Sequence, residues 1–150
     1  MAAVTKQEIL DVAAKGGLRR VLVVTALALE MKAVRAHITQ LGSVAGRAGS
    51  IYECGQFSAS GAEWLVVVAE SGAGTHAAQS VVTNARIDFE NFEIVIFVGI
   101  AGSRKPEAPV GCVVVSKQFS TRPRRGAGGP VRTRPGGADI WRYFCPRKTK

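Results

Sequence analysis

The chain is poor in cysteine and has no long apolar run. Its three cysteines, Cys54, Cys112 and Cys145, are far apart and form no CxxC pair. This spacing excludes a disulfide framework and gives no zinc signature, so reduced thiols and a cytoplasmic location are expected. The apolar run that begins at Val21 is interrupted by Glu30, and acidic residues precede it. A signal peptide and a membrane span are therefore not predicted.

Acidic residues are scarce at the C-terminal end, where Asp139 is the single one in Thr121–Lys150. That segment carries 9 Lys and Arg, a net charge of +8. Met1–Ser120 has 11 Lys and Arg against 10 Asp and Glu, a net charge of +1. The overall charge of +9 therefore says little about the partners of the body of the chain. Residues 119–150, rich in Arg, Gly and Pro, are predicted to be a mostly disordered tail.

The order of the apolar segments predicts an α/β fold. Helices are expected over 6–15, 28–41 and 74–89, and strands over 21–24, 50–57, 63–70, 94–98 and 112–115. Val and Ile fill the last two strands without polar alternation, which is typical of strands covered on both faces. We therefore predict a three-layer αβα sandwich around a central mixed sheet. Residues 1–19 would add an accessory helix, which Thr5 and Glu8 open as a capping box.

Glu30 is the first candidate site residue. It lies one helical turn past the first strand, at the edge of the sheet where open α/β folds bind ligands. A carboxylate there is suited to act as a general base with a pKa raised by burial. The alternative is a first-turn glutamate that is favoured by the helix dipole and has no further role. The sequence alone leaves both open.

A glycine-rich turn, Ser71–Gly74, is the second candidate. It leads from a strand into a helix and fits the dinucleotide pattern GxGxxA. That pattern needs an acidic residue at the end of the next strand, and Gly99–Gly102 supplies none. A nicotinamide cofactor is therefore not predicted. His37 and His76 stand alone, so neither a metal site nor a Ser-His-Asp arrangement is predicted.

Together these segments resemble the nucleoside phosphorylase superfamily, and most closely the methylthioadenosine/S-adenosylhomocysteine nucleosidases. The motifs that carry the resemblance are VLVVTALALEMKAV, YECGQF, SGAG, IVIFVGIAGS and VGCVVVSK. They occur in the family's order between residues 20 and 118, which would form a partial nucleoside phosphorylase-like domain. Similar modules occur in larger multidomain proteins.

The resemblance implies that the N-glycosidic bond of a purine nucleoside is cleaved. Glu30 matches the glutamate that activates water in the nucleosidases. Thr25–Leu29 lacks the arginine with which phosphorylases bind phosphate, so hydrolysis is expected. Ala26 and Ala73 match positions that line the nucleophile and sugar pocket, and Ile100, Ala101 and Gly102 match the stretch beside purine and ribose. No cofactor is implied, and a homo-oligomer is expected.

The C-terminal part departs from the family pattern. Family members continue with an aromatic residue that stacks on the base, a glutamate that holds the ribose and an aspartate that protonates the purine. Asp139 stands in a different context, so the chain is interpreted as a truncated version with an exposed apolar sheet edge. Two further hypotheses stay open. One is a sensor that binds a nucleoside without cleaving it. The other is nucleic-acid binding by the basic tail through residues such as Trp141 and Tyr143.

Overall fold

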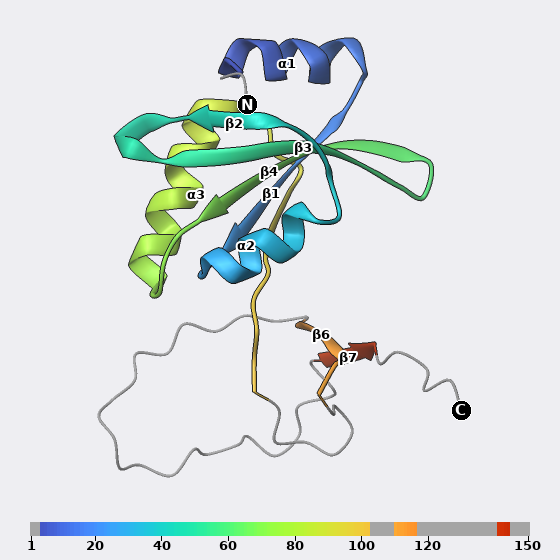
Figure 1. The fold of residues 1–150 in the computed structure, drawn as a ribbon, viewed down its shortest axis with the longest axis vertical. Coiled ribbons are helices and arrows are strands. Elements are labelled where there is room, and N and C mark those ends of the chain that lie inside the picture. Colours follow the sequence, from blue (N-terminus) through green and yellow to red (C-terminus); the bar gives the residue numbers. More distant parts are fainter. Residues whose placement is uncertain (1–3, 103–109, 117–140, 145–150) are drawn as a thin grey trace. The chain divides into compact units, whose positions relative to one another are not determined.

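A mixed five-stranded sheet forms the centre of the first of two units, Met1–Ile100 (Figure 1). The computed structural model describes residues 4–102, 110–116 and 141–144. The strands are β1 (Arg19–Thr25), β2 (Thr39–Ala45), β3 (Ile51–Ala59), β4 (Ala62–Glu70) and β5 (Ile94–Phe97), in the order β2-β3-β4-β1-β5. β1 is parallel to both of its neighbours, β4 and β5, whereas β3 is antiparallel to β4 and β2. This arrangement confirms the predicted mixed sheet.

Three helices cover the two faces of the sheet. They are α1 (Lys6–Lys15), α2 (Ala28–Arg35) and α3 (Thr75–Phe89). Side chains alternate along β1, so Leu22 and Val24 pack with residues of α1 and α3, whereas Val21 and Val23 pack with residues of α2. The three-layer αβα sandwich is therefore confirmed. β1 has apolar helices on both of its faces, which explains why its sequence shows no polar alternation.

The accessory helix begins as its sequence predicts. The Thr5 N–H donates to Glu8 Oε2 at 2.7 Å, and the Glu8 N–H donates to Thr5 Oγ1 at 3.3 Å. Ile9 and Ala13, one turn apart on the helix, are buried in the same cluster as the core residues of α3. α1 is thus part of the core and does not lie loosely on the surface.

The region after α2 differs from the prediction. A helix was expected to continue to Leu41, but α2 ends at Arg35 and the chain forms β2 from Thr39. His37, expected within a helix, lies between the two elements. β2 pairs with β3 along its length, and these backbone hydrogen bonds outweigh the helical spacing of the apolar residues. A short 3-10 helix, η1 (Arg47–Gly49), then leads into β3.

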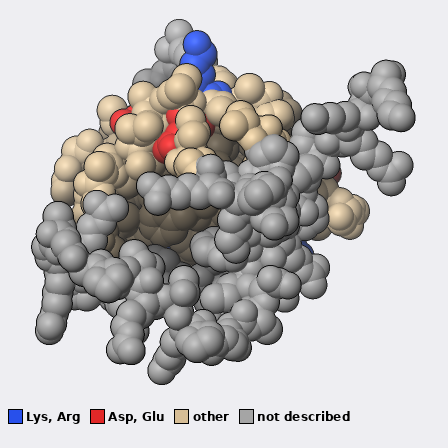
Figure 2. Space-filling model, turned by 90° about the horizontal axis from the view of Figure 1, so that it is seen from below, with Lys and Arg blue, Asp and Glu red and all other residues tan. Residues whose placement is uncertain are grey.

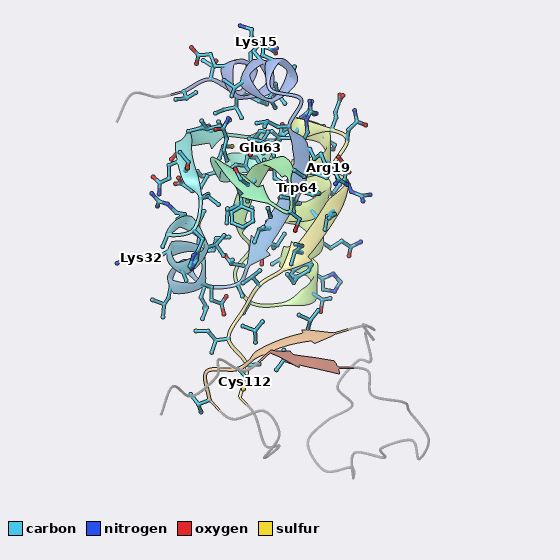
Figure 3. The ribbon with its side chains drawn as sticks, turned by 90° about the vertical axis from the view of Figure 1, so that its right-hand side faces the viewer. Lys15, Arg19, Lys32, Glu63, Trp64 and Cys112 are labelled. Atoms are coloured by element: carbon cyan, nitrogen blue, oxygen red, sulfur yellow. The ribbon has the colours of Figure 1, made fainter. Side chains whose placement is uncertain are left out.

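Arg19 links three strands at the amino end of β1. Its guanidinium carbon lies 4.3 Å from the centroid of the Trp64 ring on β4 (Figure 3). The same side chain pairs with Glu93, just before β5, at 2.6 Å. These contacts connect the amino end of β1 with β4 and with the residue that precedes β5.

The second unit, Ala101–Lys150, is described by itself. β6 (Val113–Ser116) and β7 (Trp141–Phe144) form an antiparallel pair in which Val113 stands opposite Phe144. The strand β7 lies in the segment for which the sequence predicted a mostly disordered tail; residues 117–140 and 145–150 lie outside the described part of the chain. Cys112 is disulfide-bonded, which differs from the expected reduced state, and Cys54 is a free buried thiol. Within the described residues, no helix is long and apolar enough to cross a membrane.

Candidate active site

Glu30 lies where the prediction placed it, in the first turn of α2, and its carboxylate turns back toward the end of β1. Oε2 accepts hydrogen bonds of 3.0 Å from the backbone N–H groups of Ala26 and Leu27. Oε1 accepts one of 2.8 Å from the N–H of Ile100, which follows β5. Glu30 is only 6% exposed. The carboxylate thus joins the carboxyl ends of two parallel strands, the edge where a ligand site was expected.

The three amides determine the ionisation of this carboxylate. The N–H of Ile100, followed by those of Leu27 and Ala26, lowers the pKa of Glu30 below its ordinary value, although burial acts in the opposite direction. The prediction of a pKa raised by burial is therefore wrong. Hydrogen bonds to the charged form outweigh the loss of hydration, so Glu30 is held as an anion at neutral pH.

The carboxylate of Glu30 has few free sites left at which it can accept a hydrogen bond. A carboxylate offers about four lone-pair sites, and three are filled by the amides of Ala26, Leu27 and Ile100. The remaining site can accept one hydrogen from a water molecule or a hydroxyl group. Gly99 leaves room for this arrangement, because a Cβ there would stand 3.2 Å from Oε1 of Glu30. The site is therefore suited to orient a single polar ligand group.

Thr25, which the sequence analysis did not single out, lies beside Ser71, the first residue of the predicted glycine-rich turn. The N–H and the hydroxyl of Ser71 donate to the backbone oxygen of Thr25, at 2.8 and 3.2 Å. These bonds tie the turn after β4 to the end of β1. The Thr25 hydroxyl is buried and has no hydrogen-bond partner among the described residues. A threonine that directly follows the apolar residues of β1 was the sequence signal that could have drawn attention to it.

The structure brings some predicted site residues together but not all. Ala26 and Ile100 contact Glu30 through their backbone N–H groups, and the side chain of Ile100 is 74% exposed. Ala73 is exposed in the turn between β4 and α3, at the same sheet edge. Ala101 and Gly102 belong to the second unit. The substrate-binding roles of these residues remain predictions.

A groove lies along α2, and the predicted site residues do not line it. It is an open groove of about 550 Å³, lined by Ala28, Met31, Lys32, Arg35, Ala36 and Gln40. Lys32 projects from α2 in Figure 3. Arg35 is already engaged, because its Nε lies 3.7 Å from Glu53. The groove therefore offers one uncommitted charge and no acid or nucleophile.

The other residues considered in the sequence analysis form no catalytic or metal-binding group among the described residues. His37 and His76 are both exposed, and His76 is in the first turn of α3. No group of three or more His, Cys, Asp or Glu side chains in the described part of the chain is placed to hold a metal. Charged side chains are few among the coloured residues of the face in Figure 2. The tail hypothesis concerns mainly residues outside the described ranges, apart from the backbone of β7.

Comparison with known proteins shows one family and several solved structures with a similar fold. The sequence model of the phosphorylase superfamily matches residues 20–146, a range that continues past the last motif near Gln118. None of the curated proteins matches the chain.

Two solved structures illustrate the fold. A methylthioadenosine/S-adenosylhomocysteine nucleosidase from Colwellia psychrerythraea, in complex with adenine, is 24% identical, with a TM-score of 0.54 over 87% of this chain and 51% of its own. An S-adenosylhomocysteine nucleosidase from Streptococcus pyogenes, in complex with 5-methylthiotubericidin, is 18% identical, with a TM-score of 0.54 over 83% of this chain and 51% of its own. The chain thus spans about half the length of these structures.

Proposed function

The chain belongs to the phosphorylase superfamily, and from this premise we propose that its Glu30 site serves the hydrolysis of the N-glycosidic bond of a purine nucleoside. The observation that supports the proposal most is the ionised carboxylate of Glu30, which keeps one acceptor position at the sheet edge. The absence of arginine from Thr25–Leu29 favours water over phosphate as the nucleophile.

In this reaction the bond between C1′ of the ribose and the purine nitrogen breaks, and the oxygen of water bonds to C1′. Glu30 would accept a hydrogen bond from that water and hold it in line with the departing base. The lowered pKa of Glu30 makes it a weak base, so its contribution lies mainly in orienting the water while positive charge develops on the sugar.

The departing purine also needs a proton, so the expected rate of purine release depends on whether an acidic group can supply it. Among the described residues the hydrogen-bond partners of Glu30 are backbone amides, and no second carboxylate contacts it. Asp139, the one acid after Glu107, lies outside the described residues. General acid catalysis typically contributes about 10²–10⁴ in rate. We therefore propose that the described residues alone support only slow release of purine, and that faster release requires an acid from outside the described residues.

The test is the release of free purine from methylthioadenosine, adenosine and inosine, with and without phosphate. The proteins compared are the wild type, Glu30→Gln and the control Glu63→Gln, which changes an exposed glutamate on β4. We expect phosphate-independent release that Glu30→Gln lowers and Glu63→Gln does not. Release that requires phosphate, or release that is equal in all three folded proteins, would contradict the proposal.

Binding without cleavage is a second candidate, favoured by the pKa of Glu30. A carboxylate engaged by three amides is well placed to accept a hydrogen bond from a ligand hydroxyl and poorly placed to take up a proton. This candidate predicts that a nucleoside binds in equilibrium dialysis without any purine being released. The same Glu30→Gln variant would then change affinity only.

A further inference from the structure

The strands β6 and β7 form a pair that is too small to be stable through its own packing. Each strand has four residues, and among the described residues no third strand pairs with them. The side chains of Val113, Val114 and Val115 are 61%, 43% and 49% exposed, so both faces of β6 are in contact with solvent. An isolated two-stranded sheet of this kind is only marginally stable in water. A further restraint is needed to hold β7 on β6.

A disulfide at one end of this pair supplies such a restraint. Cys112, which directly precedes β6 (Figure 3), is disulfide-bonded, whereas Cys54 is a free and buried thiol. The sequence has one further cysteine, Cys145, which lies outside the described residues but directly follows Phe144, the last residue of β7. Elimination therefore leaves Cys145 as the partner of Cys112 within this chain.

The register of the two strands agrees with this partner. β6 and β7 are antiparallel, and Val113 stands opposite Phe144. The same register, continued by one residue, sets position 112 opposite position 145. The Cα atoms of opposite residues in an antiparallel pair are about 4.5–5.5 Å apart, a separation that a disulfide bridges.

We propose that Cys112 and Cys145 form a redox-sensitive clasp that holds β7 on β6. The state of this clasp decides whether residues 113–144 are a covalently closed loop or a linear chain. The clasp opens by thiol–disulfide exchange, in which a thiolate of an external dithiol attacks one sulfur and its second thiol releases the other cysteine. Two electrons and two protons pass from the dithiol to the clasp, which leaves two cysteine thiols and the disulfide form of the reductant.

The surroundings of the cysteines distinguish the clasp from the third thiol. Exchange proceeds through the thiolate, which nearby positive charge favours, and Arg147 and Lys148 follow Cys145 within three positions of the sequence. Cys54 is only 1% exposed, and burial raises its pKa to about 12, so it remains a thiol at neutral pH and takes no part in exchange. The proposal concerns the second unit and does not depend on the chemistry proposed at Glu30.

Peptide mapping of the full-length protein tests the pairing. The wild type is equilibrated with glutathione disulfide or with dithiothreitol, its free thiols are blocked with N-ethylmaleimide, and it is digested with trypsin. We expect the peptides 105–117 and 143–147 to be joined in the oxidised sample and to be separate and alkylated in the reduced one. A bond from Cys112 to Cys54, a bond between two chains, or two unlinked cysteines in the oxidised sample would overturn the proposal.

Hydrogen exchange tests whether the clasp holds the two strands together. A cross-link over a loop of about 30 residues favours the closed state by roughly 10²–10³-fold, because it removes chain entropy from the open state. The amides that pair β6 with β7 should therefore be protected in the oxidised wild type and lose protection by a factor of this order in dithiothreitol.

Two full-length variants serve as the matched comparison. Cys145→Ser should exchange like the reduced wild type in either buffer, whereas the control Cys54→Ala should respond to dithiothreitol as the wild type does. The two samples of the wild type decide the test on their own if Cys54→Ala fails to fold. Protection of β6 and β7 that dithiothreitol leaves unchanged overturns the proposal, because the strands then pair without the clasp. Strands that are unprotected in the oxidised protein overturn it as well.

Discussion

The carboxylate of Glu30 and the backbone N–H of Ile100, 70 positions apart in the chain, form a hydrogen bond of 2.8 Å. This bond crosses the end of β1 and joins the start of α2 to the segment that leaves β5. The same carboxylate also holds Ala26 and Leu27, which lead into α2. Glu30 therefore organises the sheet edge on which it lies, in addition to any chemistry there.

We expect the stability contributed by Glu30 to be present at neutral pH and lost in acid. The folded pKa of Glu30 is lowered by the amides of Ile100, Leu27 and Ala26. A group with a lowered folded pKa binds fewer protons in the native state than in the unfolded state. Its contribution is complete above the unfolded pKa and disappears as the pH falls through the folded pKa. Urea unfolding of the wild type and Glu30→Gln should differ at neutral pH and converge well below the ordinary value of 4.5.

Two other carboxylates do not disturb this comparison. Glu8 and Glu93 also have lowered pKa values, through Thr5 and Arg19 respectively, but they are unchanged in both proteins and their effects cancel. A stability difference that is the same at neutral and acidic pH would contradict the assigned role of the three amides.

Thr25→Val should stabilise the protein. The Thr25 hydroxyl is buried without a hydrogen-bond partner among the described residues, and valine has nearly the same shape. An unsatisfied buried polar group costs about 1–3 kcal/mol, so we expect the free energy of unfolding to rise by about 1 kcal/mol. The control is Thr83→Val, because the Thr83 hydroxyl on the exposed side of α3 already donates to Gln79. Urea unfolding measures both.

The result for Thr25→Val also bears on the site. If a nucleoside uses this hydroxyl, the variant gains stability but loses affinity for the ligand. A variant that is less stable than the wild type would mean that the hydroxyl has a partner, such as a bound water, and would contradict the prediction.

The sequence predicted those elements whose signals are local. The capping box of Thr5 and Glu8 formed as expected, and the apolar runs around Val21 and Ile94 became parallel strands. β2 was missed because Leu41 continues the helical spacing of α2, whereas the pairing of Thr39–Ala45 with β3 depends on residues far along the chain. Local periodicity carries no information about such a partner.

The position of Glu30 could be predicted, but its ionisation could not. A glutamate one turn past a strand is visible in the sequence, and burial was expected to raise its pKa. The donor that matters most, the N–H of Ile100, is a backbone group from a distant segment and has no sequence signature. The role of Asp88 could not be predicted from the sequence either, because its partners come from three other elements of the fold.

Asp88→Ala should be strongly destabilising. The buried carboxylate of Asp88 on α3 accepts hydrogen bonds from the N–H of Arg47 at 2.9 Å and the hydroxyl of Tyr52 at 3.2 Å. It also lies 3.8 Å from Nζ of Lys6. Removing it leaves the buried Tyr52 hydroxyl without its acceptor, and we expect a loss of about 3 kcal/mol in the free energy of unfolding.

The matched comparison for Asp88 is Arg47→Met. The Arg47 side chain is largely exposed and its Nε lies 3.5 Å from Asp88, so its loss should cost less than about 1 kcal/mol. A double-mutant cycle of Asp88→Ala with Tyr52→Phe should give a coupling of about 1 kcal/mol or more. Equal losses for Asp88→Ala and Arg47→Met would show that the surface ion pair, and not the buried hydrogen bonds, stabilises this junction.

Ile9→Ala should destabilise the whole first unit, although α1 lies before the range that matches the phosphorylase superfamily. Ile9 is fully buried in the cluster that includes Leu22 of β1 and Phe89 of α3. Truncating such a side chain costs about 2–5 kcal/mol, because it removes apolar contacts and leaves a cavity. Val12→Ala, on the exposed side of the same helix, should cost less than about 1 kcal/mol. Unfolding is followed by the fluorescence of Trp64 on β4, outside α1, in proteins that also carry Trp141→Phe, because the chain has a second tryptophan at that position. This measurement distinguishes two cases. If α1 is part of the core, the Trp64 transition shifts with Ile9→Ala; if α1 unfolds separately, the Trp64 transition stays where it is in the wild type.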